Sequence, residues 1–454
     1  MRGGALRRAR EAAAGARKRW RQRRVWDAVM HPRLGFLSPL PPERTGVATY
    51  SAAVLDGLRR IGFTERHDLD VVWPLEPKHE GIVPWYSLGI YQLGNNVEFH
   101  RDIYRFACQA PGLVVLHDLA LDDFVRGMVV AGDPLGFVAE REAARLRERL
   151  STPDVVRNEP LRDPFCGHVV RRARGVIVHS EFGRRYLREL GCRTPVFVVP
   201  HPPVEREEDL RRAATRAPRI RAPLERRGCR TLVVAPGDLN EAKQLGAVLA
   251  AVSRLEPDVF VALVGRRIEG YDVDRAVAAS GLGERVTLAA DVDDEDFRAW
   301  ILAADVVVDL RHPHRGEVSG SLARAMQAGR ACVVSATGTY LDIPDDMVCR
   351  VGAGPTDPAE LAATLRRLVE NPRERRRLGD AAAASIAARA EEEATARGYA
   401  TAIEATLELI RDPVRTAIAR WGGALVDVGV DDDMVREGYG LSYAAAFEDF
   451  TSSP

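Results

Sequence analysis

One polar loop, residues 310–321, carries several residue types that can do chemistry together, reading LRHPHRGEVSGS. It follows an apolar run, and a helical stretch then begins at Ser319, a good N-cap residue, and ends at Gly329. The N–H groups at such a helix start, near Gly320 and Ser321, can bind an anion such as a phosphate. An ordinary capped turn between a strand and a helix has the same pattern, so this segment alone leaves both interpretations open.

A second segment, residues 234–244, repeats the order of apolar run, glycine turn and helix start, with Gly237 in the turn. The 65 basic residues of the chain include only three lysines, so a lysine at such a position carries more weight than usual. The ammonium group of Lys243 could bind a diphosphate. A solvated surface lysine is the alternative.

The first half of the chain offers polar residues after its own apolar runs. Thr45 and Gly46 follow the first run, and a glycine there would let a ligand approach the backbone, although a plain turn glycine fits equally well. His117 and Asp118 follow a later run, where a general acid or base, a ligand of sugar hydroxyls and a structural hydrogen bond are all open interpretations. Similar positions hold Asn95, His179 and His201.

Eleven short apolar runs rich in β-branched residues alternate with amphipathic helical stretches. Such continuous runs are typical of strands that helices cover on both faces. The alternation predicts an α/β fold with doubly wound parallel sheets. The runs span residues 34–37, 69–73, 88–93, 113–116, 176–178, 196–199, 231–235, 259–264, 286–289, 306–310 and 331–335.

The alternation pauses at residues 202–228, where four prolines interrupt an arginine-rich stretch. We therefore expect two Rossmann-like domains, 31–201 and 229–390, joined by a linker over 202–228. The carboxyl ends of both sheets would face a central cleft, where ligands of this architecture bind. Residues 391–454 are expected to form the end of a long helix, from about 382 to 410, and a tail.

Composition excludes several classes of protein. The chain has 454 residues, 46% of them hydrophobic and 29% charged, and its 65 basic and 65 acidic residues cancel. This excludes a globally basic nucleic-acid binder and a globally acidic solvating protein. No apolar run approaches the roughly 18 residues of a membrane-spanning helix. The six scattered cysteines form no C-x-x-C pair, so we expect a reducing cytoplasm and neither a disulfide framework nor zinc.

Residues 1–30 form a basic arm, with ten basic residues and a single acid, Glu11, in the first 24 positions. A helix with one basic side could contact anionic lipid at the inner face of the membrane. A solvated arm is the alternative. No recognised nucleic-acid-binding fold accompanies the arm, so nucleic acid is not expected as a partner. The acidic pair Asp291 and Asp293 looks like helix capping, and no metal site is predicted.

Taken together, these segments resemble glycosyltransferases of the GT-B fold, specifically those of family 4. The resemblance covers roughly residues 33–410 and rests on five pieces in order: residues 37–51, 91–119, 175–187, 198–204 and 310–344. It implies transfer of a sugar from a nucleotide-sugar donor to an acceptor hydroxyl, with retention of anomeric configuration and without a cofactor or a required metal. It also implies a last helix that crosses back to the N-terminal domain.

The resemblance further implies roles for single residues, with the donor mostly on the C-terminal domain and the acceptor mostly on the N-terminal one. His117 and Glu317 would be catalytic, His117 by contacting the transferred sugar. On the acceptor side the candidates are Thr45, Asn95 and Asp118. The donor would be bound by Gly46, Gly237, Lys243, Arg311, Glu317, Ser319, Gly320, Ser321 and Arg324.

The chain departs from the family pattern at two places. Asp238 stands where an arginine is common, and an acid there would repel a diphosphate, so Arg311 or Arg315 would have to assist Lys243. Of the usual pair of glutamates eight positions apart, Gly316 stands in place of the first and Arg324 in place of the second, which normally binds the ribose. The identity of the base is therefore left open.

Two other functions remain open on the same fold. A nucleotide-sugar 2-epimerase would need no acceptor. A transferase-like protein that binds a nucleotide or a partner without turnover would account for Asp238 and Arg324. Among acceptors, polysaccharides, glycolipids and small metabolites are all compatible with the sequence.

Overall fold

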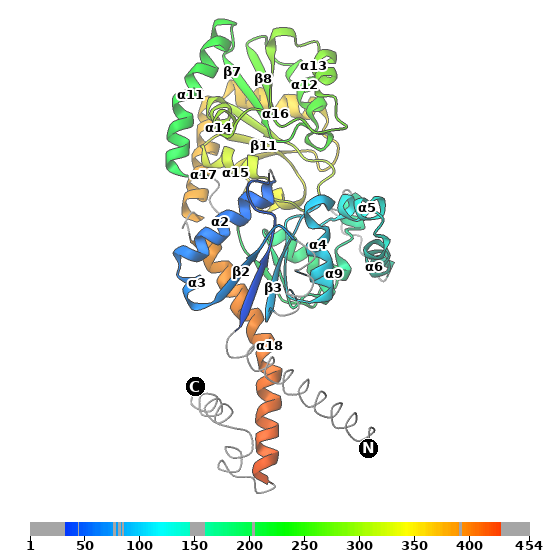
Figure 1. Cartoon of the computed structure of the whole chain (residues 1–454). Coiled ribbons are helices and arrows are strands. Elements are labelled where there is room, and N and C mark those ends of the chain that lie inside the picture. The colour runs from blue at the N-terminus through cyan, green and yellow to red at the C-terminus, as the bar shows by residue number, and fades with distance from the viewer. Residues whose placement is uncertain are drawn as a thin grey trace. The chain divides into compact units, whose positions relative to one another are not determined.

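The computed structural model describes residues 32–43, 45–75, 79, 83, 86–145, 159–201, 205–389 and 393–427. The predicted basic arm, residues 1–30, lies outside the described residues. The chain divides into two compact units, Met1–Ala402 and Ile403–Pro454, and the first contains both sheets (Figure 1).

Two six-stranded sheets, each parallel throughout, form the two halves of the first unit. In the N-terminal sheet the strand order is β2-β1-β3-β4-β5-β6, and in the C-terminal sheet it is β12-β11-β10-β7-β8-β9. The N-terminal strands are β1 (Arg33–Leu37), β2 (Asp68–Val72), β3 (Leu88–Leu93), β4 (Leu113–Leu116), β5 (Gly175–Val178) and β6 (Val196–Val198). The C-terminal strands are β7 (Thr231–Pro236), β8 (Val259–Gly265), β9 (Val286–Ala290), β10 (Val306–Asp309), β11 (Ala331–Ser335) and β12 (Val348–Val351).

Helices cover both faces of each sheet, as the continuous burial of the strands requires. In Figure 1, α2 and α3 lie on one side of the N-terminal sheet and α4 and α9 on the other. The helices of this half are α2 (Gly46–Arg60), α3 (Phe63–Arg66), α4 (Val97–Gln109), α5 (Asp122–Val130), α6 (Pro134–Arg145), α8 (Glu159–Arg162), α9 (Gly167–Arg172) and α10 (Glu181–Glu189). Those after β6 are α11 (Glu207–Arg226), α12 (Leu245–Val252), α13 (Val273–Ala279), α14 (Asp294–Ala303), α15 (Gly320–Gln327), α16 (Pro358–Glu370), α17 (Pro372–Arg389) and α18 (Ala394–Asp427), with short 3-10 turns η3 (Glu241–Lys243), η4 (Gly283–Arg285) and η5 (Gly338–Asp342).

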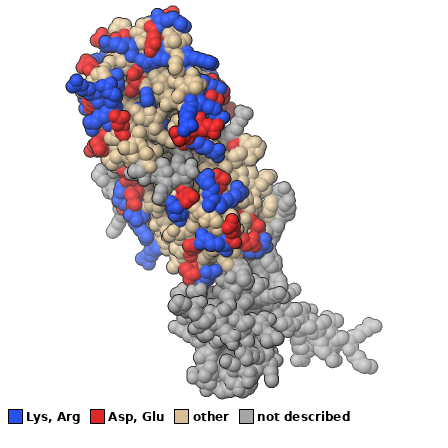
Figure 2. Space-filling model, turned by 90° about the vertical axis from the view of Figure 1, so that its left-hand side faces the viewer, with Lys and Arg blue, Asp and Glu red and all other residues tan. Residues whose placement is uncertain are grey.

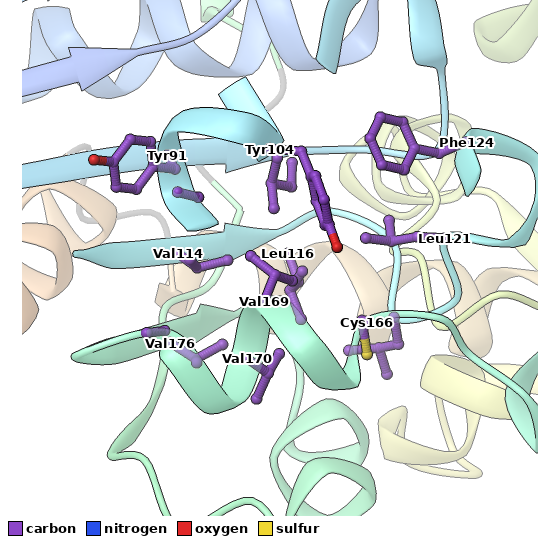
Figure 3. Close-up of a cluster of buried hydrophobic side chains, with 14 of the residues drawn as sticks. Tyr91, Tyr104, Val114, Leu116, Leu121, Phe124, Cys166, Val169, Val170 and Val176 are labelled. Atoms are coloured by element: carbon purple, nitrogen blue, oxygen red, sulfur yellow. The ribbon is translucent and has the colours of Figure 1, made fainter. Parts of the chain in front are cut away.

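Neighbouring residues of a central strand point to opposite faces of the sheet and pack into two different hydrophobic cores. Val233 of β7 packs in one cluster with α12 and α16, while its neighbour Leu232 packs in another with α14, α15 and α17. The N-terminal half has a matching cluster, in which Val114 and Leu116 of β4 lie among side chains of α4, α5 and α9 (Figure 3). Because the central strands are buried on both faces, the loops at the strand ends are left to carry polar chemistry.

All eleven predicted strands are present, and within the described ranges there is one further strand, β12, that the sequence did not predict. It is an edge strand that reads VCRV, with an arginine inside it. That charge broke the apolar pattern on which the prediction depended. The edge of the sheet can accommodate the charge of Arg350, because its side chain donates a hydrogen bond to the carbonyl of Tyr340 at 3.1 Å.

The stretch expected as a linker, residues 202–228, is mostly helical. Helix α11 covers Glu207–Arg226 and contains Pro218 and Pro223, two of the prolines that predict an interruption. It packs along α14, where Arg216 pairs with Asp296 at 2.7 Å. Tertiary packing thus outweighs the helix-breaking tendency of the prolines. The predicted domain boundaries themselves stay a prediction.

The single helix expected near residues 382–410 is in fact two helices, α17 and α18. The first turns of α18 contact the N-terminal half: Thr395 donates to the carbonyl of Pro200, just beyond β6, at 3.0 Å, and the Tyr399 hydroxyl lies 3.1 Å from that of Tyr50 on α2. The chain therefore does return to its N-terminal half after the second sheet, as the resemblance implied.

The distribution of charged side chains on the surface is consistent with the formal net charge of zero. On the face that Figure 2 presents, basic and acidic side chains are mixed over the described part of the chain. None of the helices in that part is long and apolar enough to cross a membrane.

Candidate functional site

The strand order of the C-terminal sheet has its topological switch point between β7 and β10, the position at which such sheets form their binding crevice. These strands are neighbours, but the chain leaves β7 toward β8 on one side and leaves β10 toward β11 on the other. Ligands of open α/β sheets bind at such a switch point, outside the carboxyl ends of the strands. The loop that holds Gly237 follows β7, and the loop 310–321 follows β10, so both predicted segments meet at this crevice.

Lys243 is buried at the switch point and bound to a carboxylate. Only 5% of the residue is exposed, and its ammonium group pairs with Asp309, the last residue of β10, and donates to the Ser321 hydroxyl at 3.3 Å. Burial lowers the pKa of Lys243, while Asp309 opposes that change. The Tyr340 hydroxyl donates to the other oxygen of Asp309 at 3.0 Å. The lysine is therefore a positioned cation, and the solvated-lysine alternative is wrong.

Gly237 lets the β7 loop approach this group. Its φ is +118°, and a Cβ atom there would lie 3.0 Å from Lys243 Nζ and 3.1 Å from Ser321 Oγ. A side chain would therefore strain the backbone and press on both groups. The structure thus brings Gly237, Lys243 and Ser321 together, as the sequence predicted.

The loop after β10 folds around the carboxylate of Glu317. Arg311 Nε lies 3.1 Å from one oxygen, and the backbone N–H of Arg315 donates to the other at 2.7 Å. Burial by itself would raise the pKa of Glu317, but the Arg311 guanidinium and backbone N–H donors outweigh it and lower that pKa. Glu317 is therefore an ionised carboxylate throughout the neutral range.

His314 holds the shape of this loop. It is fully buried, and its Nδ1 accepts the N–H of Gly316 at 2.7 Å. Thr339 lies 3.3 Å from the other ring nitrogen and donates to the carbonyl of Glu317 at 2.8 Å. Because Nδ1 accepts a hydrogen bond, the ring is neutral, consistent with burial lowering its pKa.

Helix α15 begins at the same crevice. Ser319 is its N-cap and accepts the N–H of Leu322 at 3.2 Å, which confirms the predicted cap. The N–H groups of Gly320 and Ser321 lie in the first turn, where a helix provides no internal partners and where its dipole is positive. This helix start and the Lys243 ammonium share Ser321 and so can bind one anion together.

The loop also contacts the N-terminal half of the unit. The carbonyl of Arg315 accepts the N–H groups of Leu119 and Ala120 at 2.8 and 2.9 Å. The Arg315 side chain donates to Asp122, at the start of α5, at 2.8 and 3.1 Å. Loops from the two sheets are therefore joined directly beside Glu317.

Gly316 has a structural reason to be a glycine. Its φ is +83°, and a Cβ atom would lie 2.5 Å from Leu119. The position where the resemblance places a glutamate therefore has no room for a side chain, and the carboxylate stands one residue later at Glu317.

Thr45 and Gly46 lie at the start of α2, just after β1. The Thr45 hydroxyl accepts the N–H of Ala48 at 3.0 Å and so caps the helix. A Cβ atom at Gly46 would meet none of the described atoms within 4 Å, so the space over this helix start is open. The structure places both residues at the carboxyl edge of the N-terminal sheet, at its own switch point between β1 and β3.

Asn95 and Asp118 are joined by a hydrogen bond, and Asn95 also forms a hydrogen bond with α5. The N–H of Asn95 donates to Asp118 at 3.0 Å, and the Asn95 side-chain oxygen accepts the N–H of Phe124 at 2.9 Å. Burial and the nearby Glu317 raise the pKa of Asp118 to about 7. The structural hydrogen bond that the sequence left open is thus present for both residues.

His117 lies just beyond β4, next to the first turns of α2. Its Nε2 is 2.9 Å from the side-chain oxygen of Gln92, which is fully buried. Its ring packs edge-on against that of Tyr50, with centroids 4.7 Å apart. These contacts fix the ring orientation at the carboxyl edge of the sheet.

Asp238 and Arg324, the two residues that depart from the family pattern, each pair with an oppositely charged side chain. Asp238 makes two hydrogen bonds with Arg266, at 3.2 and 3.0 Å, so its charge is largely compensated. Arg324 ion-pairs with the buried Glu205 at 2.6 Å and lies over the ring of Phe297. Its side chain is committed to that pair, and the structure does not join it to the Lys243 group.

Sequence reasoning missed Asp309, which organises the crevice. It had been counted as part of an apolar run. A carboxylate in the last position of a buried strand was the available signal, because such a charge needs a partner at the strand end. Asp122 was missed as well, since its partner Arg315 is 193 positions away.

Comparison with known proteins finds a family match within the second half of the chain. Residues 217–385 match the family model of glycosyl transferases group 1. Over 155 residues, 33% of this chain, the sequence is 32% identical to an MMP alpha-(1->4)-mannosyltransferase of Mycolicibacterium hassiacum. Over 133 residues, 29% of this chain, it is 29% identical to a 2-deoxystreptamine glucosyltransferase of Streptomyces kanamyceticus. The matches span about a third of these relatives, 37% and 33% of their lengths.

Solved structures resemble a much larger part of the chain. The Anabaena HepE protein in complex with UDP and glucose aligns with 83% of this chain and all of its own, at a TM-score of 0.57 and 15% identity. The sucrose-phosphate synthase of Thermosynechococcus elongatus aligns with 86% of this chain and all of its own, at 0.54 and 18% identity. At these identities the likeness shows the fold. The predicted pair of Rossmann-like domains in the GT-B arrangement is therefore confirmed.

Proposed function

We propose that this protein is a glycosyltransferase that moves a sugar from a nucleotide-sugar donor to an acceptor hydroxyl. The observation that carries the proposal is the meeting of Lys243, Ser321 and the start of α15 at the β7–β10 switch point. This crevice lies within residues 217–385, the part of the chain that matches glycosyl transferases group 1. The two curated relatives, named as a mannosyltransferase and a glucosyltransferase, support the same reaction class.

The crevice suits the diphosphate of such a donor. An ammonium group has three N–H donors, of which Asp309 and Ser321 occupy two, so one remains for a phosphate oxygen. The N–H groups at the start of α15 add neutral donors at a positive helix end. Negative charge grows on the leaving diphosphate in the transition state, and donors already in place stabilise it there. On this basis we propose that transfer needs no metal ion at the diphosphate.

The reacting sugar would lie between Glu317 and His117. Glu317 is held ionised by Arg311 and can bind sugar hydroxyls or stabilise developing positive charge on the ring. His117, on the N-terminal sheet, would contact the same sugar from the other side. With the resemblance to family 4, this arrangement supports a transfer that retains anomeric configuration.

The acceptor is proposed to bind on the N-terminal side, over Thr45 and Gly46. The open space above the start of α2 leaves room for a hydroxyl-bearing molecule. That surface would determine which class of acceptor binds: a polysaccharide, a glycolipid or a small metabolite. A membrane contact through residues 1–30 falls outside the described residues.

A thermal-shift screen of the full chain against UDP, GDP, dTDP and ADP tests the donor site. A nucleotide at 100 times its Kd should stabilise the fold by about 2.7 kcal/mol. UDP is the first choice because it occupies the HepE structure. A shift with one nucleotide identifies the base, and no shift with any of them contradicts a donor site at this crevice.

An activity assay separates the two enzymatic alternatives. With the stabilising nucleotide supplied as its sugar conjugate, a transferase should release free nucleotide faster when an acceptor is added. A 2-epimerase should convert the donor without any acceptor and without releasing nucleotide. The second result would contradict the proposed transfer.

We expect Arg266→Ala to weaken nucleotide binding by about two- to fivefold, which is about 0.4–1 kcal/mol. Asp238 lies near enough to Lys243 to affect its pKa, and Arg266 compensates the Asp238 charge. Removing Arg266 therefore exposes an incoming diphosphate to that charge, whereas Asp238→Asn should strengthen binding. Titration calorimetry measures both.

Arg230→Ala is the matched control for this pair. Arg230 is also an exposed arginine of the C-terminal half, paired with Asp258 at 2.9 Å. It should leave the nucleotide Kd unchanged. Equal effects of Arg266→Ala and Arg230→Ala would contradict a local role for Asp238.

A further inference from the structure

Three histidines from three neighbouring strands come together at the carboxyl edge of the N-terminal sheet. His117 follows β4, His179 follows β5 and His201 lies three residues beyond β6. The ring nitrogens that they offer all lie within 4.8 Å of one another. The ring of Tyr50 packs against all three, with centroids 4.7 to 5.0 Å away. The strand order thus assembles a histidine cluster from residues up to 84 positions apart.

The hydrogen bonds of two rings leave lone pairs for a ligand. His179 Nδ1 lies 3.0 Å from the carbonyl of Val199 and must donate to it, so Nε2 carries a lone pair. That Nε2 is buried and has no hydrogen-bond partner among the residues that the structure describes. His117 Nε2 lies 2.9 Å from the side-chain oxygen of Gln92 and donates to it, which leaves Nδ1 with a lone pair.

The cluster favours neutral rings. Burial lowers the pKa of His179 to about 4, and the pKa values of His117 and His201 are lowered in the same direction by burial and by the neighbouring histidines. Neutral imidazole is the form that coordinates metals. A metal ion bound at Nε2 of His179 would supply the partner that this buried atom lacks among the described residues.

We propose that His117, His179 and His201 bind one divalent transition-metal ion of the kind that prefers imidazole, such as Zn²⁺, Co²⁺, Ni²⁺ or Cu²⁺. Three imidazoles with a fourth position open to water match the ligand set of tetrahedral zinc sites. Nitrogen ligands disfavour Mg²⁺, Ca²⁺ and Mn²⁺, which prefer oxygen. Metal–nitrogen bonds of about 2.0–2.1 Å would draw the nitrogens to about 3.4 Å apart, a small adjustment of three side chains.

The surroundings supply what such a site needs beyond its ligands. A carbonyl group and a glutamine amide hold the second nitrogens of His179 and His117, which is the usual way to orient metal-binding histidines. His117 and His201 are only partly buried, so an ion can reach the cluster from the surface. The histidines are far apart in the sequence, and for that reason their spacing predicted no metal site.

The site goes beyond the proposed transfer reaction. The bound ion would occupy the His117 lone pair, and none of its three ligands belongs to the Lys243 group. If His117 contacts the donor sugar as proposed above, the ion would inhibit transfer. Metal binding itself does not depend on that function, so it can be tested without donor or acceptor.

The test is a titration of the full chain, purified without a histidine tag and stripped with EDTA, with Co²⁺ followed by visible absorption and with Zn²⁺ by calorimetry. We expect one equivalent of Co²⁺ to give the intense absorption of a tetrahedral site. His179→Gln and His201→Gln should each weaken binding at least about tenfold. His201→Gln is the milder change because His201 is partly exposed.

His168→Gln is the matched control, since His168 lies on α9 outside the cluster, and it should bind metal as the wild type does. Gln92→Ala should weaken binding by about 10- to 100-fold, because His117 loses the group that orients it. Circular dichroism checks that each variant is folded. Wild-type chain that takes up no metal, or folded His179→Gln and His201→Gln variants that bind it as wild type does, would overturn the proposal. A thiolate charge-transfer band would overturn it too, because it would place the ion on cysteine.

Discussion

Lys243→Met should abolish nucleotide binding and also destabilise the protein. The substitution leaves the carboxylate of Asp309, which is fully buried, without its partner. Breaking a buried ion pair on one side costs about 3–5 kcal/mol. Calorimetry of nucleotide binding and denaturant unfolding measure the two effects separately.

The double variant Lys243→Met, Asp309→Asn separates the two roles of the lysine. It removes both charges, so most of the lost stability should return. Nucleotide binding should stay lost, because no ammonium faces the crevice. A double variant that binds nucleotide as tightly as the wild type would contradict a diphosphate site at Lys243.

Glu317→Gln should lower kcat by about 10²–10³-fold, the usual effect of removing one group that stabilises the transition state. The amide has the same shape but no charge, so it cannot stabilise positive charge on the sugar. Affinity for the free nucleotide should change little, because the proposed diphosphate contacts come from Lys243 and the start of α15. Steady-state kinetics and nucleotide calorimetry on one preparation test both statements.

The variant Glu140→Gln is the matched control for Glu317→Gln. Glu140 is also a fully buried glutamate, and it accepts the Tyr104 hydroxyl at 2.8 Å and the N–H of Val169 at 3.0 Å. It lies in the N-terminal core, so its loss should lower the free energy of unfolding but not kcat. Equal losses of kcat in the two variants would show that Glu317 acts only through stability.

Much of the donor crevice could be predicted from its sequence because its parts are local. A glycine turn after an apolar run predicted the β7 loop at Gly237, and Ser319 before a helical stretch predicted the cap of α15. Both signals depend on residues a few positions apart. The role of Asp238 could not be read in the same way, because the Arg266 that compensates it lies on another loop.

Other features could not be predicted because they depend on contacts between residues that are far apart in the sequence. The prolines in 202–228 predicted a linker, and only the packing of α11 on α14 shows why a helix survives there. Arg324 stands where the resemblance places a ribose ligand, and its side chain pairs with Glu205, more than a hundred positions earlier. A buried carboxylate attracts an arginine wherever the chain brings one near, and the sequence does not show that proximity.

By itself, the sequence determined eleven of the twelve described strands, the start of α15 and the α/β class, because burial on both faces imposes continuous apolar runs and a capped helix start has a local pattern. The tertiary structure alone decided which residues of the chain contact each other. The strand order sets β7 beside β10, which joins Lys243 to Asp309 across 66 positions, and sets β4, β5 and β6 side by side, which gathers three histidines. Such pairings depend on which strands are neighbours and on the cost of leaving a buried charge or lone pair unpartnered, and neither has a periodicity that a sequence can display.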